Sequence, residues 1–140
     1  MCIRDRQALW EMACAGGVAD RLRFTGVRND IPRLMREADL ITLPSLTEAC
    51  SMVIIEAMAM GKPVVATRAG GNLELVDDGV TGLLVERAHD AVAEATVRIL
   101  QDLPGRDRMG AAARTRAEER FSARAMAQNM EALYQRVLSR

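Results

Sequence analysis

The sequence predicts an α/β fold in which helices cover a parallel sheet. Short apolar runs alternate along the chain with longer segments of helical periodicity, as in consecutive strand–helix units. One of these runs, Pro63–Thr67, is almost entirely apolar, which is typical of a strand buried on both faces of a parallel sheet. The 140 residues, 49% of them apolar, suffice for one domain with one core.

The first half of the chain contains two predicted helices and two predicted strands. A helix is expected at Gln7–Ala15, and a short strand at Leu22–Thr25. Asp30 is a good N-cap for a second helix, which would extend to Ala38. The apolar run Leu40–Leu43 is expected to form the next strand.

The second half continues the alternation. A helix is expected at Ser51–Met60, ended by Gly61 in the C′ position, and the strand Pro63–Thr67 follows it. A short helix at Asn72–Val76 and a strand at Thr81–Val85 come next. From residue 89 the pattern is mainly helical, and a long last helix carries one apolar face: Met126, Met130, Leu133, Tyr134 and Val137.

Charge and cysteine content exclude several classes of protein. Nineteen basic side chains balance nineteen acidic ones, so nothing favours nucleic acid as a partner. The three cysteines match no zinc or CxxC spacing, which predicts a reducing, cytoplasmic setting and no metal site. No apolar run could span a bilayer, and we expect no signal peptide and no cofactor.

A candidate binding site lies at the start of the predicted helix Ser51–Met60. After Ser51 this helix is apolar except for Glu56, and Glu48 lies just ahead of it. The free N–H groups and the positive dipole end of a helix attract phosphate, and carboxylates accept hydrogen bonds from hydroxyl groups. Two carboxylates beside one such end suit a nucleotide sugar, in which a diphosphate joins ribose and sugar. Two structural alternatives stay open: Glu56 on a narrow solvent stripe, and Glu48 as an ordinary N-terminal helix charge.

The segment PSLTEACSMVIIEAMAMGKPVVATRAGGNLELVDDGVTGLLV, Pro44 to Val85, resembles the donor-binding core of retaining glycosyltransferases of family 4, which have the GT-B fold. Glu48 and Glu56 match the E-x7-E motif of that family. The resemblance implies a partial Rossmann-like parallel sheet, strands 3 to 6 in the order 3-2-1-4-5-6, with Leu22–Thr25 as strand 3.

The resemblance also implies roles for individual residues. Glu48, the candidate catalytic residue, would bind hydroxyls of the donor sugar, and Glu56 those of the ribose. Val27 would lie near the nucleobase. Backbone amides at the start of the helix would hold the diphosphate and stabilise it as leaving group: Ala49, Cys50, Ser51 and Met52.

Several residues in and near this region have simpler interpretations. Ala49-Cys50-Ser51 replaces the Gly-Phe-Gly that is commonest in the family, and Cys50 is interpreted as a packing residue. His89 is interpreted as part of a helix start, and Gly70 and Gly71 as turn or cap residues.

The resemblance covers residues 7–140, which we interpret as a truncated GT-B C-terminal domain. Residues 1–6 match nothing in the family and are interpreted as a sequencing artefact. The acceptor-binding N-terminal Rossmann-like domain and the usual diphosphate-binding cations are not in this sequence, so we expect the chain alone to be inactive. Peripheral membrane association of the full-length parent stays open. One alternative is a non-catalytic nucleotide-sugar-binding module. A second alternative, a nicotinamide-dependent oxidoreductase, lacks support because no GxGxxG motif follows a predicted strand in this sequence.

Overall fold

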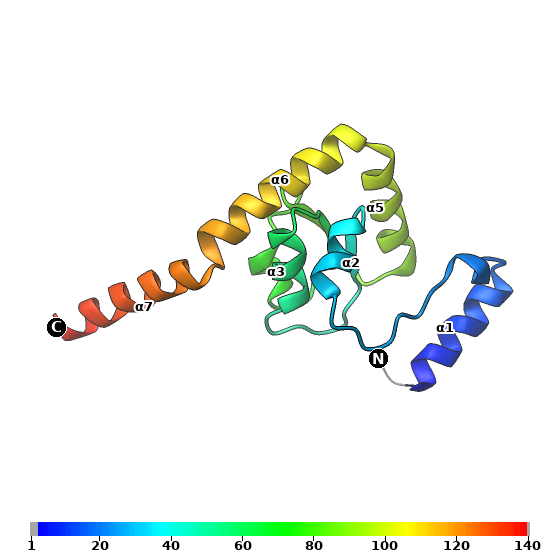
Figure 1. Ribbon diagram of the computed structural model, residues 1–140, viewed down its shortest axis with the longest axis horizontal. Helices are drawn as coiled ribbons and strands as arrows, with labels where there is room; N and C mark the ends of the chain where they lie inside the picture. Colours follow the sequence, from blue (N-terminus) through cyan, green and yellow to red (C-terminus); the bar gives the residue numbers. More distant parts are fainter. Residues whose placement is uncertain (1–2, 140) are drawn as a thin grey trace. The chain divides into compact units, whose positions relative to one another are not determined.

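The computed structural model describes residues 3–139 (Figure 1). The chain divides into two units, and the boundary in the sequence lies between Ile31 and Pro32. The elements in chain order are α1 (Ile3–Ala15), the 3-10 turn η1 (Ala19–Arg21), α2 (Ile31–Glu37), β1 (Ile41–Leu43), α3 (Met52–Ala59), β2 (Val64–Thr67), α4 (Asn72–Leu75), β3 (Gly82–Val85), α5 (His89–Gln101), α6 (Leu103–Arg120) and α7 (Ala123–Leu138).

The first unit consists of α1, η1 and a segment without regular structure that leads to α2. The strand predicted at Leu22–Thr25 is wrong, because no strand forms there. Its side chains do alternate, with Leu22 and Phe24 half-buried and Arg23 and Thr25 exposed. The alternation of apolar and polar side chains indicates only which of them face an apolar neighbour. A strand also needs a partner strand for its backbone N–H and C=O groups. No strand in residues 3–139 supplies that partner.

Asp30 is the expected N-cap of α2, but its carboxylate pairs with the Arg28 side chain. Its two oxygens accept hydrogen bonds from Nε and Nη2 of Arg28 at 2.7 and 2.6 Å. This pairing lowers the pKa of Asp30, mainly through the hydrogen bond from the guanidinium, and raises the pKa of Arg28. The helix still begins at Ile31, as the sequence predicts.

The second unit is built on a three-stranded parallel sheet in the order β1-β2-β3. Val64 of β2 is in register with Ile41 of β1 and with Gly82 of β3. All four residues of β2 are buried, which confirms the prediction of a strand covered on both faces. In the described part of the chain β1 pairs with β2 alone, which leaves its other edge without a strand.

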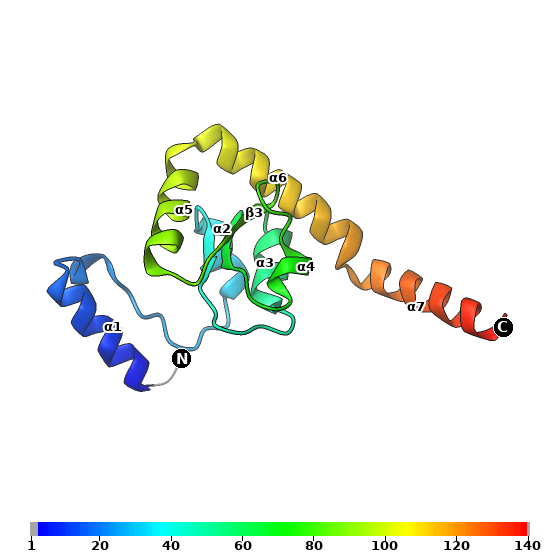
Figure 2. The ribbon, with the colours of Figure 1, turned by 180° about the vertical axis from the view of Figure 1, so that it is seen from behind.

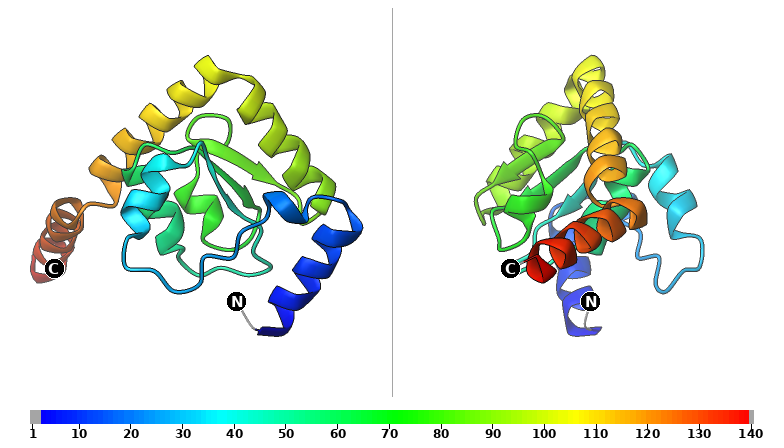
Figure 3. Two further views of the ribbon diagram at one scale, coloured as in Figure 1. Left: turned by 45° about the vertical axis from the view of Figure 1, so that its right-hand side comes forward. Right: turned by 90° about the vertical axis from the view of Figure 1, so that its left-hand side faces the viewer.

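Helices cover both faces of the sheet (Figure 3). On one face Val64 and Ala66 pack with buried side chains of α3 and α6, including Ile54 and Ala113. On the other face Val65 packs against α5. This three-layer arrangement confirms the predicted α/β fold with a parallel sheet and flanking helices.

The predicted long last helix is also present, as α7, and Figure 2 shows it following the end of α6. Ala125 is the one buried side chain of this helix. Its apolar face is exposed, at Met126, Met130, Leu133, Tyr134 and Val137. None of the helices described is long and apolar enough to cross a membrane.

Candidate functional site

The start of α3 is built as the sequence predicts. Ser51 is the N-cap, with extended backbone at φ −83° and ψ 107°, and its Oγ accepts a long hydrogen bond of 3.4 Å from the Ile54 N–H. The first N–H groups of a helix have no acceptor within the helix, so those of Met52 and Val53 are free to bind an anion. Because β1 leads into the loop before α3, this helix end lies on the carboxyl side of the sheet, where α/β folds bind ligands.

Glu56 lies one turn inside α3, and its side chain is exposed. It shares this side of the helix with Met52 and Val53, which are also exposed, whereas Ile54 and Met58 are fully buried. The carboxylate therefore lies in solvent, so α3 carries this acid without burying it. An exposed acid on an otherwise apolar surface beside a helix N-terminus is available to a ligand.

Glu48 is half-buried in the loop before α3, and its side chain has a defined partner. The Ser45 hydroxyl donates a hydrogen bond of 2.7 Å to Glu48 Oε1. The backbone carbonyl of Glu48 accepts a hydrogen bond of 3.0 Å from the Gly71 N–H. One carboxylate oxygen is thus engaged inside the protein, and Oε2 remains as an acceptor for a ligand hydroxyl.

Gly70 and Gly71 hold the Glu48 loop by close backbone approach. A Cβ at Gly70 would overlap the carbonyl oxygen of Glu48, and one at Gly71 would overlap that of Ala49. Gly70 has a φ of +45°, and Gly71 is the N-cap of α4, which confirms that they are turn and cap residues. Their absent side chains also let the two loops touch, which the sequence does not show.

Two other residues predicted for the site have different outcomes. Cys50 is exposed, so its interpretation as a packing residue is wrong: the loop that carries it rests on Gly70 and Gly71 through its backbone and directs this side chain outward. Val27 belongs to the first unit and is fully exposed, and its role at the nucleobase stays a prediction.

A pocket of about 260 Å³ opens at the carboxyl edge of the sheet. The last residue of β2 and residues that follow β1 and β3 line it: Pro44, Leu46, Thr67, Arg87, Ala88, His89 and Val92. Arg87 Nη1 donates a hydrogen bond of 3.1 Å to the Leu46 carbonyl and so fastens the Glu48 loop to the loop after β3. His89 is the first residue of α5 and is exposed, in line with its interpretation as part of a helix start.

Sequence reasoning missed Ser45, Thr67 and Arg87. Each lies at or just after the carboxyl end of a strand. The rule that parallel sheets bind ligands at that edge could have selected all three. Their hydrogen bonds, by contrast, depend on tertiary structure. In the described part of the chain no group of three or more histidine, cysteine, aspartate or glutamate side chains could hold a metal ion.

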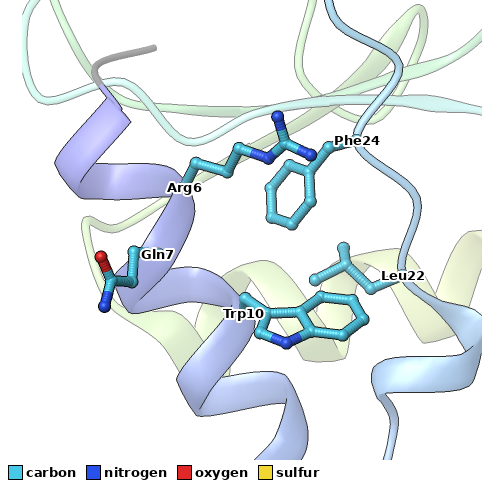
Figure 4. Close-up of a pocket in the computed structure, with 5 residues that line it drawn as sticks. All are labelled: Arg6, Gln7, Trp10, Leu22 and Phe24. Atoms are coloured by element: carbon cyan, nitrogen blue, oxygen red, sulfur yellow. The ribbon is translucent and has the colours of Figure 1, made fainter.

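The first unit has a separate, mainly apolar pocket of about 460 Å³ between α1 and the segment after η1 (Figure 4). Trp10 lies beside Leu22, and the Arg6 guanidinium lies over the Phe24 ring, 5.1 Å from its centroid. The half-buried Leu22 and Phe24 of the incorrectly predicted strand thus contact α1 residues of the same unit.

Comparison with known proteins shows which proteins this chain is similar to. A family model described as "Glycosyl transferases group 1" matches residues 4–102. D-inositol 3-phosphate glycosyltransferase of Corynebacterium diphtheriae is 38% identical over 128 residues, which are 89% of this chain and 30% of that protein. N-acetyl-alpha-D-glucosaminyl L-malate synthase of Bacillus anthracis is 34% identical over 86% of this chain and 32% of its own length. The chain thus spans about a third of the length of these relatives.

Solved structures give the same result. HepE of Anabaena in complex with UDP superposes with a TM-score of 0.86 at 33% identity, over 92% of this chain and 36% of that one. Its complex with UDP-glucose gives a TM-score of 0.83 at 32% identity, over 95% of this chain and 37% of that one. Sucrose-phosphate synthase of Thermosynechococcus elongatus gives 0.83 at 31% identity, over 97% and 35%.

Proposed function

Because the chain belongs to the group 1 glycosyl transferases, we propose that it binds the nucleotide-diphosphate sugar donor of such an enzyme at the N-terminus of α3. One observation carries this proposal: a half-buried Glu48 and an exposed Glu56 lie on either side of the first turn of a capped helix. Glu48, the free amides at the start of α3 and Glu56 thus follow one another in the same order as the sugar, the diphosphate and the ribose of the donor.

In the proposed complex the backbone amides from Ala49 to Met52 bind the diphosphate. These dipoles are fixed before the reaction, so they stabilise the negative charge that develops as the sugar leaves. Glu56 binds the ribose hydroxyls, and Glu48 binds sugar hydroxyls through Oε2.

The whole protein is proposed to transfer the sugar to an acceptor with retention of configuration at the anomeric carbon. Transfer also needs an acceptor site and cations that neutralise the diphosphate, and we propose that a second Rossmann-like domain supplies the acceptor site. The 140-residue chain alone is then a donor-binding unit without transferase activity. HepE, which has been crystallised with both UDP and UDP-glucose, supports UDP-glucose as the first donor to test.

Isothermal titration calorimetry of the chain with UDP, UDP-glucose and UMP tests the proposal. UMP lacks the second phosphate, so it should bind more weakly than UDP if the helix end holds the diphosphate. Equal affinity for UMP and UDP would contradict the phosphate site. Transfer of sugar by the chain alone to water or to an added acceptor would contradict its proposed role as a donor-binding unit.

A further inference from the structure

We infer that Ser45 is a positioning residue for Glu48, and that Thr67 and Asn72 fix Ser45 from inside the fold. This inference rests on the proposed function, because the proposed function supplies the sugar that the Glu48 carboxylate binds. It concerns a chain of three hydrogen bonds that runs from the buried start of α4 to the candidate sugar site.

The hydrogen bonds connect four residues in one direction. Asn72 Nδ2 donates to the Thr67 carbonyl at 3.0 Å, and Thr67 Oγ1 donates to the Ser45 carbonyl at 2.5 Å. The Ser45 hydroxyl then donates to Glu48 Oε1 at 2.7 Å. A hydroxyl has a single proton to donate, so both hydroxyl protons are committed and the order of donors and acceptors is set.

The inner end of this chain of hydrogen bonds is buried in the core. Asn72 is 0% exposed and Thr67 is 2% exposed, and Thr67 ends the central strand of the sheet. A buried hydroxyl without a partner is unfavourable, so Thr67 keeps hold of the Ser45 carbonyl. The backbone of Ser45 is therefore anchored to the sheet, although Ser45 itself lies in a half-buried loop.

The outer end of the chain determines the state of the Glu48 side chain. A free glutamate samples many rotamers, and ordering it on binding has an entropic cost. The Ser45 bond holds Oε1 before any ligand arrives, so that Oε2 is the oxygen that meets a sugar hydroxyl. Preorganisation of this kind improves affinity for the group that Glu48 binds and for no other part of the donor.

The consequence is a selective effect on the sugar half of the donor. Removing the Ser45 hydroxyl should lower the affinity for UDP-glucose and leave the affinity for UDP unchanged. Because the Ser45 bond restricts only the rotamers of the Glu48 side chain, we expect a loss of about fivefold to tenfold in the ratio of the two affinities. Ser45→Thr keeps a hydroxyl and should restore most of the ratio.

Thr67 provides an independent variant, which matters if Ser45→Ala disturbs the loop. Thr67→Val has the same shape without the hydroxyl, and should lower the same ratio, whereas Thr67→Ser should restore it. Ser139→Ala and Thr115→Val are the matched controls, since both hydroxyls bond only to a backbone carbonyl a turn earlier in the chain. Circular dichroism of every variant establishes that it is folded.

A double-mutant cycle decides whether Ser45 acts through Glu48. We predict that Ser45→Ala lowers the affinity ratio in the native chain and has no further effect on it in a Glu48→Ala background. A wild-type chain that binds neither UDP nor UDP-glucose would refute the proposed function, and this inference with it. Two results would overturn the positioning role alone, in a wild-type chain that prefers UDP-glucose to UDP. One is an affinity ratio that stays unchanged in Ser45→Ala and Thr67→Val. The other is a fall in this ratio on Ser45→Ala that is as large in the Glu48→Ala background as in the native chain.

Discussion

Substitution of Gly70 by alanine should destabilise the second unit strongly, because two separate penalties meet at this position. The φ of +45° is unfavourable for any residue with a Cβ, at about 1–2 kcal/mol. The new Cβ would also overlap the Glu48 carbonyl oxygen. That atom belongs to a backbone and cannot rotate away, so overpacking should add about 1–3 kcal/mol.

Two other glycines separate these penalties. Gly79 has a φ of +80° and open space within 4 Å of the position that a Cβ would take, so Gly79→Ala should lose only the conformational term, about 1–2 kcal/mol. Gly71 has an ordinary φ of −63°, but its Cβ would overlap the Ala49 carbonyl, so Gly71→Ala should lose only the packing term. Gly70→Ala should exceed both.

Urea denaturation followed by far-UV circular dichroism measures the three free energies of unfolding. Gly70→Ala should be the least stable variant, at about 2–5 kcal/mol below wild type. Gly70→Ala and Gly71→Ala should also weaken UDP binding, because the displaced loop carries the amides that bind phosphate. If Gly70→Ala were no less stable than Gly79→Ala, the two loops would not be in backbone contact and the description of the site would be wrong.

Three further predictions concern individual carboxylates. Glu56→Ala should weaken UDP binding by about 1.5–3 kcal/mol through lost ribose contacts, while the free energy of unfolding changes by less than about 0.5 kcal/mol. An unchanged affinity for UDP by calorimetry, or an equal loss in the exposed control Glu131→Ala, would exclude the ribose role. Glu48→Gln should reduce the affinity for UDP-glucose more than that for UDP, and equal losses would count against its place on the sugar side. The pKa of Asp30, followed by carboxyl NMR, should lie below its usual range and return to it in Arg28→Gln; since the folded-state pKa is lowered, the stabilisation by this pair should be present above the unfolded pKa and be lost as the pH falls through the folded one.

Much of the fold follows from local patterns in the sequence. The continuous apolar run before Thr67 predicts the buried central strand, and Gly61 ends α3 with a φ of +69°, as a C′ glycine should. Leu22–Thr25 shows the limit of such reasoning. Its alternation is real, but a strand exists only where another strand supplies hydrogen-bond partners, and that is a property of tertiary structure.

The site shows the same division. The single acid of an apolar helix points to Glu56, and its exposure on α3 explains why the helix tolerates a charge. The prediction for Cys50 fails because the exposure of this side chain depends on the approach of Gly70 and Gly71, which are distant in the sequence. Ser45 and Thr67 could be placed at the edge of the sheet, but the direction of their hydrogen bonds follows only from the folded structure.

The most direct test of the donor site is NMR mapping of ligand contacts on the isotopically labelled chain. With UDP, the largest amide shifts should occur from Ala49 to Val53, and the Glu56 side chain should also respond. Replacing UDP by UDP-glucose should add shifts at Ser45 and Glu48 and leave those at the start of α3 in place. Shifts confined to the pocket between Trp10 and Leu22, or shifts from UDP-glucose that leave the start of α3 unperturbed, would contradict a nucleotide-sugar site at this helix.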